Sequence, residues 1–204
     1  QLYGRWTVNR RATEAKKWNR SLRIALSTKT HTCRLWSATD ILMLEPWEVS
    51  GHQYIAKLGP DVVIEETTTG ELIEHMNQKR FQRKRLKTLL LEQGFFAGIG
   101  NYLRSEVLFT AKIHPDRTVS SLDEDEKTRL AEKALFLSRQ SYKVPGITVD
   151  LELYEQLRDI GLSRGQARHW VFTRNDRPCH QCGELILHTR PGGRRLDYCP
   201  TCQN

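Results

Sequence analysis

Cys179-His180-Gln181-Cys182 ends sixteen residues before Cys199-Pro200-Thr201-Cys202, and this pair of motifs constrains the fold more strongly than any other pattern in the chain. The spacing is C-x2-C, sixteen residues, C-x2-C. Thiolates are soft ligands, and four of them at this spacing are typical of a closed, tetrahedral zinc site. Two disulfides or four unconnected cysteines are the alternatives, which the paired spacing disfavours. We therefore expect one structural Zn²⁺ at Cys179, Cys182, Cys199 and Cys202.

The residues between the two cysteine pairs predict a β-hairpin. Leu185 to Arg190 and Arg194 to Tyr198 read as strands, and Pro191-Gly192-Gly193 reads as the turn between them. A closed metal site is structural, so the metal would hold an arginine-rich hairpin in place.

Charge indicates an anionic partner. The 204 residues carry a net charge of +8, and residues 1–34 contain nine Lys or Arg against one acid, Glu14. Residues 79–87 form a second basic run, on a segment that we expect to be helical. A single run is usually a solvated helix face, but two runs and a basic hairpin favour a nucleic acid. No apolar stretch approaches the roughly 20 residues of a membrane span.

The chain predicts an α+β protein of three parts. Residues 1–8, 21–27 and 31–38 read as strands, and we expect residues 1–57 to be the C-terminal part of a larger β-sandwich domain. The fifth cysteine, Cys33, falls in a strand and would be a buried thiol. We expect residues 58–170 to form a helical domain and residues 171–204 the zinc finger.

Capping signals and apolar spacing predict four or five helices in the middle part. Capping boxes at 68–71 and 121–124 would begin two of them, the second ending near Arg139 and burying Leu130, Ala134 and Leu137. Others are expected around 86–90, stopped by Gly94, around 103–107, ended by His114-Pro115, and around 153–160, stopped by Gly161.

Gly94 to Glu106 joins two of these helices and contains three glycines within seven residues. Such a segment allows a sharp double turn and close approach of the backbone. Asn101 then opens a helix, whose free N–H groups favour a phosphate. The alternative is that Asn101 only caps the helix.

These residues resemble a known family. Gly98 to Glu106 is similar to the helix-two-turns-helix motif of the formamidopyrimidine-DNA glycosylase and endonuclease VIII superfamily, and the cysteine hairpin resembles its zinc finger. Gln1-Leu2-Tyr3 resembles the wedge of the endonuclease VIII branch, which fills the gap left by an everted nucleotide. The resemblance implies a bacterial cytoplasmic, monomeric repair enzyme that excises oxidised bases, mainly pyrimidines, from double-stranded DNA and cleaves the abasic strand.

The resemblance also implies roles for single residues. Asn101 would hold a backbone phosphate, and Lys57 matches a DNA-contacting arginine of the family. Arg195 matches the finger arginine that is credited with the second elimination step; Arg194 takes its place under a one-residue shift.

One departure from the family stands beside these matches. The family's nucleophile is the amine of an N-terminal proline followed by a glutamate, and neither occurs here. The chain begins at the wedge, so we expect a fragment that is inactive as given. The alternative function is a non-catalytic, zinc-dependent DNA-binding module.

Overall fold

The computed structural model describes residues 4–11 and 19–203, which form two compact units, Gln1–His52 and Gln53–Asn204. The first unit contains a three-stranded antiparallel sheet of β1 (Arg5–Arg10), β2 (Leu22–Ser27) and β3 (His31–Trp36), in the order β1-β3-β2. In its register Val8 lies opposite Cys33, and Leu26 pairs with Cys33 from the other side. The three predicted strands are confirmed.

This sheet buries few of its side chains. Within it Trp36 and Thr32 are buried, whereas Val8 and Leu26 are mainly exposed. Cys33 was predicted to be a buried thiol, and this prediction is wrong, because it is half-buried on a thin sheet.

The second unit begins with a 3-10 turn, η1 (Ile55–Lys57), and continues into the helices. These are α1 (Thr69–Met76), α2 (Leu86–Leu89), α3 (Asn101–Thr110), α4 (Glu124–Lys143), α5 (Leu151–Asp159) and α6 (Arg164–Ala167), with a second 3-10 turn, η2 (Val119–Ser121), before α4. The finger hairpin consists of β4 (Leu187–Thr189), the turn η3 (Pro191–Gly193) and β5 (Leu196–Tyr198), and the predicted strand-turn-strand order is confirmed. No helix in the described part of the chain combines the length and apolar character that crossing a membrane requires.

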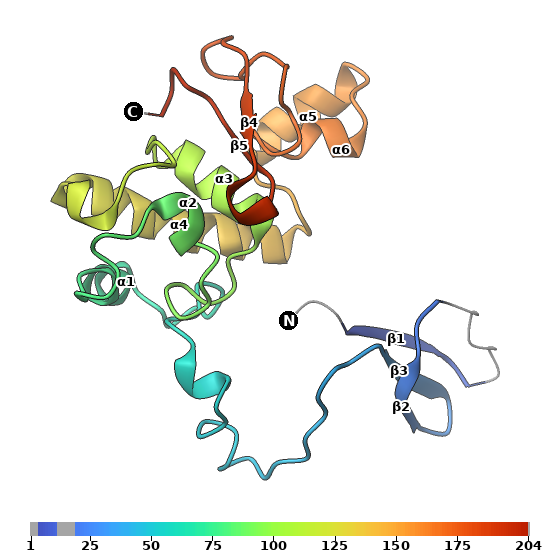
Figure 1. The fold of residues 1–204 in the computed structure, drawn as a ribbon. Coiled ribbons are helices and arrows are strands. Elements are labelled where there is room, and N and C mark those ends of the chain that lie inside the picture. Colours follow the sequence, from blue (N-terminus) through green and yellow to red (C-terminus); the bar gives the residue numbers. More distant parts are fainter. Residues whose placement is uncertain (1–3, 12–18, 204) are drawn as a thin grey trace. The chain divides into compact units, whose positions relative to one another are not determined.

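Helix α3 is central to the second unit. In Figure 1 it lies between α4 and the β4–β5 hairpin, and it contacts both elements. Its residues 103–109 are all buried. One apolar cluster joins α1, α2, α3 and α4 and reaches Leu196 of β5, and a second joins Phe109 of α3 to Trp170, Ile186 and two of the cysteines. The finger therefore shares its core with the helices, which stabilises its position against α3.

The structure corrects three predictions about helices. The basic run 79–87 is not one helix, because only Leu86–Leu89 are helical and the N–H groups of Leu86 and Lys87 donate to Arg117 and Pro115. Helix α4 begins from a capping box of Asp123 and Glu126 and runs to Lys143. Ser121 instead forms a box with Thr118 in η2. The third correction concerns α5. Ile160 was predicted to lie on its apolar face, but the helix ends at Asp159 and Ile160 is 73% exposed.

Candidate nucleic-acid interface and metal site

The four predicted cysteines come together at the base of the finger. Their sulfur atoms all lie within 4.8 Å of one another, with Cys179 Sγ 4.0 Å from Cys202 Sγ and Cys182 Sγ 3.5 Å from Cys199 Sγ. Each Cys-x2-Cys pair lies beyond the end of a hairpin strand, so the register of β4 and β5 sets the distance between the two cysteine pairs. The backbone N–H of Gln181 donates to Cys179 Sγ at 3.4 Å, which is the kind of second contact that orients a thiolate ligand.

The environment of these thiols favours a bound cation. Burial raises the pKa of Cys199 and of Cys202, whereas a hydrogen bond from the backbone of Glu184 lowers the pKa of the exposed Cys182. Four thiolates this close repel one another, and a divalent cation among them would relieve the repulsion. The chain thus places four cysteines to bind a metal ion, and the donor set fits a soft or borderline ion. His180 is half-buried against Trp170 and is not part of the sulfur cluster.

The glycine turn brings two distant segments into backbone contact. Gly59 N donates to Gln93 O, and a side chain at Gly59 would begin 2.3 Å from the carbonyl oxygen of Phe95. At Gly94 an added Cβ would lie 2.9 Å from the carbonyl oxygen of Lys57. Only glycine permits this approach. The contact places the backbone of Lys57 at the turn that leads to Asn101, while its side chain is exposed.

Asn101 is the first residue of α3 and does not cap it. The N-cap is Gly100, which has extended backbone angles and no capping side chain. The Asn101 side-chain oxygen instead accepts a hydrogen bond from Arg104 Nη2 at 3.0 Å. Its side-chain NH₂ makes no hydrogen bond to any other described residue. The half-buried Asn101 amide therefore has donors that no described residue accepts, at a helix N-terminus, which is an arrangement that suits an anion.

Arg104 connects this helix terminus to the finger. Its guanidinium is fully buried and donates to the carbonyl oxygens of Lys87 (2.6 Å), Arg195 (2.7 Å) and Arg194 (3.2 Å). All of its hydrogen-bond acceptors are neutral. Burial and, to a smaller extent, the nearby Arg194 lower the pKa of Arg104 to about 10, while Asp197 opposes the shift, and at this pKa Arg104 is charged at neutral pH. One buried cation thus fixes Asn101 and the arginine-bearing end of the hairpin relative to each other.

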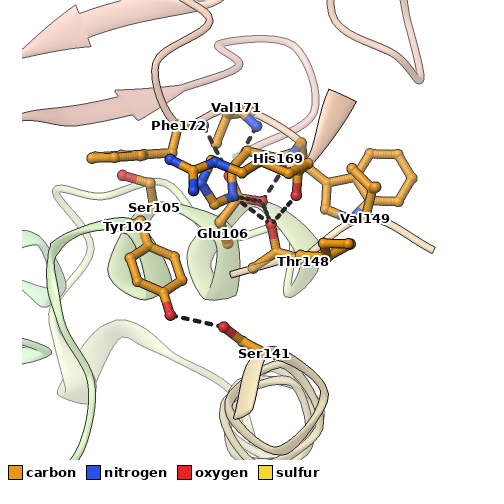
Figure 2. A network of polar contacts seen from close by, with 12 residues as sticks. Tyr102, Ser105, Glu106, Ser141, Thr148, Val149, His169, Val171 and Phe172 are labelled. Atoms are coloured by element: carbon orange, nitrogen blue, oxygen red, sulfur yellow. Dashed lines mark hydrogen bonds and ion pairs between the residues drawn. The ribbon is translucent and has the colours of Figure 1, made fainter. Parts of the chain in front are cut away.

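Glu106, two residues further along α3, fixes the segment that leads into the finger. Its buried carboxylate accepts backbone N–H bonds from Trp170 (2.8 Å), Val171 (2.9 Å) and Phe172 (2.9 Å) and a hydroxyl bond from Thr148 (2.5 Å). Figure 2 shows Glu106 with Thr148, Val171 and Phe172 around it. Burial raises the pKa of Glu106, which these four hydrogen bonds oppose.

His169 belongs to the same polar network. Its Nδ1 lies 2.9 Å from the Thr148 hydroxyl, and burial lowers the pKa of His169 to about 3, so the ring is neutral at pH 7. Because a neutral histidine, a hydroxyl and a satisfied carboxylate fill this space, the network serves to hold the finger rather than to react.

The two finger arginines differ in their surroundings. Arg195 Nε donates to Asp197 at 2.7 Å and its Nη2 donates to Asn175, leaving the side chain 25% exposed. Arg194 is exposed, and its side chain has no hydrogen bond or ion pair to another described residue. The structure therefore brings Asn101 and the backbone of both arginines together through Arg104. Gln1, Leu2 and Tyr3, the predicted wedge, lie outside the described residues.

Sequence reasoning missed Arg104, Glu106 and Asp197, which organise the interface. A signal was present: Arg104 and Glu106 interrupt the apolar residues of a helix that packs on both sides, and charges at such positions must have buried partners. Apart from Asn101, which lies three residues before Arg104, the partners of Arg104 and Glu106 lie 17 to 91 residues away along the chain, which no local pattern reveals.

Comparison with known proteins agrees with this geometry. Residues 58–151 match the formamidopyrimidine-DNA glycosylase H2TH domain. Endonuclease 8 of Pectobacterium carotovorum subsp. carotovorum (strain PC1) is 36% identical over 203 residues, covering 100% of this chain and 73% of the relative. Endonuclease 8 of Escherichia coli O9:H4 (strain HS) is 34% identical over 204 residues, with 100% and 74% coverage.

Solved structures share the fold. A MutM complex with DNA containing carbocyclic 8-oxo-G superposes with a TM-score of 0.76 at 21% identity, over 100% of this chain and 72% of that one. Lactococcus lactis Fpg in complex with abasic-site DNA gives a TM-score of 0.74 at 20% identity, over 100% and 73%. The two endonuclease 8 relatives are 36% and 34% identical to this chain, which covers 73% and 74% of their length, and residues 58–151 match the family's H2TH domain. The chain therefore belongs to the formamidopyrimidine-DNA glycosylase and endonuclease VIII family.

Proposed function

We propose that this chain binds damaged double-stranded DNA as part of a base-excision repair glycosylase and abasic-site lyase that removes oxidised bases, mainly pyrimidines. The observation that carries the proposal is the Arg104 bridge, which joins the Asn101 amide to the backbone of Arg194 and Arg195. A helix N-terminus and a cationic hairpin held at a fixed separation suit successive phosphates of one strand.

Phosphate contacts would come from three places in this arrangement. The Asn101 amide would donate to a phosphate oxygen, and Lys57 would add a point charge near the glycine turn. One of the two finger arginines would contact phosphates beside the lesion, Arg195 by the family match and Arg194 by its exposure. Such contacts position the protein and make its affinity dependent on salt.

The wedge would act on the bases. Chemistry at a damaged nucleotide requires it to leave the stack, which costs a few kcal/mol. Insertion of Leu2 and Tyr3, beside Gln1, would offset part of that cost by filling the gap in the duplex.

We further propose that the metal at Cys179, Cys182, Cys199 and Cys202 is one Zn²⁺ with a structural role. Four cysteines fill a tetrahedral coordination sphere and leave no position for water or substrate. The ion would fix the ends of the hairpin and therefore the position of the finger arginines. Catalysis would fall to an amine that forms an iminium with the sugar carbon.

Residues 1–204 do not include the proline–glutamate pair that supplies this amine in the family, so we propose that this polypeptide by itself does not catalyse the reaction. The finger arginine that contacts the lesion, Arg195 by the family match or Arg194 by its exposure, would support the second elimination but cannot replace the nucleophile, because a guanidinium stays protonated. A non-catalytic DNA-binding module remains the second candidate, favoured by the same observation.

Borohydride trapping distinguishes the parts of this proposal. The 204-residue chain should bind a duplex containing thymine glycol or an abasic site but cross-link no better than an unrelated basic protein of the same charge. The same chain preceded by the family's proline-initiated region should cross-link and cleave. Efficient trapping by the 204-residue chain would contradict the assignment of the nucleophile, and failure of the extended chain would favour the binding module. We expect a monomer in the bacterial cytoplasm, which sedimentation and fractionation would check.

A further inference from the structure

Asp197 lies in β5, two residues after Arg195, and its carboxylate is completely buried. Three donors from three segments satisfy it: the backbone N–H of Thr173 at 2.7 Å, Arg195 Nε at 2.7 Å and His188 Nδ1 at 2.8 Å. His188 lies directly opposite Asp197 in the hairpin register. A buried carboxylate is costly unless it is paired and hydrogen-bonded, so these three bonds act together.

The consequence for Arg195 is that its charge is already compensated. Its Nε donates a hydrogen bond to Asp197, its Nη2 donates one to Asn175, and its side chain is three-quarters buried. Its Nη1 has no hydrogen bond to a described residue, but moving the whole guanidinium onto a phosphate would break both contacts and uncover the Asp197 carboxylate. Uncovering a buried charge by removing its partner is strongly unfavourable.

Arg194 has the opposite situation. Its backbone carbonyl is fixed by Arg104 Nη2 at 3.2 Å, while its exposed side chain has no hydrogen bond or ion pair to any of the other residues described. A cation with a fixed backbone and an uncommitted side chain loses no protein contact when it binds a phosphate. It also releases counterions from the DNA when it does so.

We propose that Asp197 is a positioning residue that retains Arg195 inside the finger and leaves Arg194 as the hairpin arginine that faces the DNA. This inference rests on the proposed function, because it concerns which cation the finger presents to a phosphate. Asp197 therefore selects between two neighbouring arginines that the sequence makes equivalent.

The test measures the slope of log affinity against log salt for the zinc-loaded 204-residue chain on a duplex with a tetrahydrofuran abasic-site analogue. Arg194→Ala should lower the slope by about one, and Arg195→Ala should leave it nearly unchanged. Asp197→Asn keeps the shape but removes the charge, so Arg195 becomes available and the slope should rise by about one. Adding Arg195→Ala to Asp197→Asn should remove that rise.

Glu184→Gln is the matched control, because it removes the charge of an exposed acid of the same finger whose side chain accepts from the N–H of Leu185 and has no hydrogen bond to Arg195 or Asn175. It should raise the slope less than Asp197→Asn does, with no dependence on Arg195. Zinc content and melting temperature are measured for every variant. If Asp197→Asn does not fold, the comparison of Arg194→Ala with Arg195→Ala still decides the question.

The inference is overturned if Arg195→Ala lowers the slope by about one while Arg194→Ala does not, or if folded Asp197→Asn behaves like the native chain. Asn101→Ala, measured in parallel, separates this from failure of the proposed function. Absence of duplex binding by the native chain, or full affinity of Asn101→Ala, refutes the proposed function whatever the arginine variants do.

Discussion

Replacing Arg104 with Met tests how the helix terminus and the finger are held together. Met fills much of the same volume but donates no hydrogen bond, so the carbonyl oxygens of Lys87, Arg194 and Arg195, which accept from Arg104 in partly buried bonds, lose this donor. Each buried acceptor left unpaired costs about 1–3 kcal/mol. Removal of the buried cation offsets part of this destabilisation, because burial of a guanidinium is itself unfavourable. We expect a net loss of about 3 kcal/mol in the free energy of unfolding of the second unit.

For a domain of this size, 1 kcal/mol corresponds to roughly 2–4 °C in melting temperature, so Arg104→Met should melt about 6–12 °C below the native chain. Thermal unfolding by circular dichroism, on zinc-loaded protein, measures this. Arg104→Lys keeps the charge but has fewer hydrogen-bond donors, so its melting temperature should fall by about half as much as that of Arg104→Met. Arg83→Met, at an exposed arginine outside this network, should change the melting temperature little. The reasoning is refuted if Arg104→Met melts within about 2 °C of native, or if Arg83→Met loses as much.

Three further predictions concern the metal and the DNA. Cys182→Ser should lose the bound zinc and most duplex affinity, whereas Cys33→Ser should keep both; equal zinc content by metal analysis would reject the cysteine site. Asn101→Ala should weaken duplex binding without changing the salt slope, whereas Lys57→Ala should lower that slope by about one; identical slopes in anisotropy titrations would exclude Lys57 as a phosphate contact. Leu2→Ala should reduce the preference for an abasic-site duplex over an intact one while leaving intact-duplex affinity unchanged, and an unaltered preference in competition binding would remove Leu2 from the wedge.

Local patterns predicted much of the second unit. The cysteine cluster and the hairpin turn follow from spacing within a single hairpin, and the apolar face of α4 follows from helical periodicity. The glycine turn was also recognisable, because Gly94, Gly98 and Gly100 lie within seven residues. In each case the decisive residues lie close together in sequence or in one periodic element.

Non-local hydrogen bonds decided the features that were mispredicted or missed. The basic run 79–87 has helix-forming residues, but the N–H groups of Leu86 and Lys87 are used by the 115–117 segment. Arg104 donates to carbonyl oxygens of other segments, and Asp197 accepts from Thr173 and His188 as well as from the neighbouring Arg195. These contacts also distinguish Arg194 from Arg195. Tertiary partners override local propensity in these places, and a sequence without a structure does not identify them.

Lesion-selective DNA binding tests the central claim most directly. The measurement is the affinity of the zinc-loaded 204-residue chain for a duplex with one tetrahydrofuran abasic-site analogue, in competition with the same duplex undamaged, over a range of salt concentrations. The account predicts tighter binding to the abasic-site duplex, a linear fall of log affinity with log salt, and loss of affinity in Asn101→Ala. Absence of duplex binding at low salt, or equal binding of both duplexes with no effect of Asn101→Ala, would contradict it.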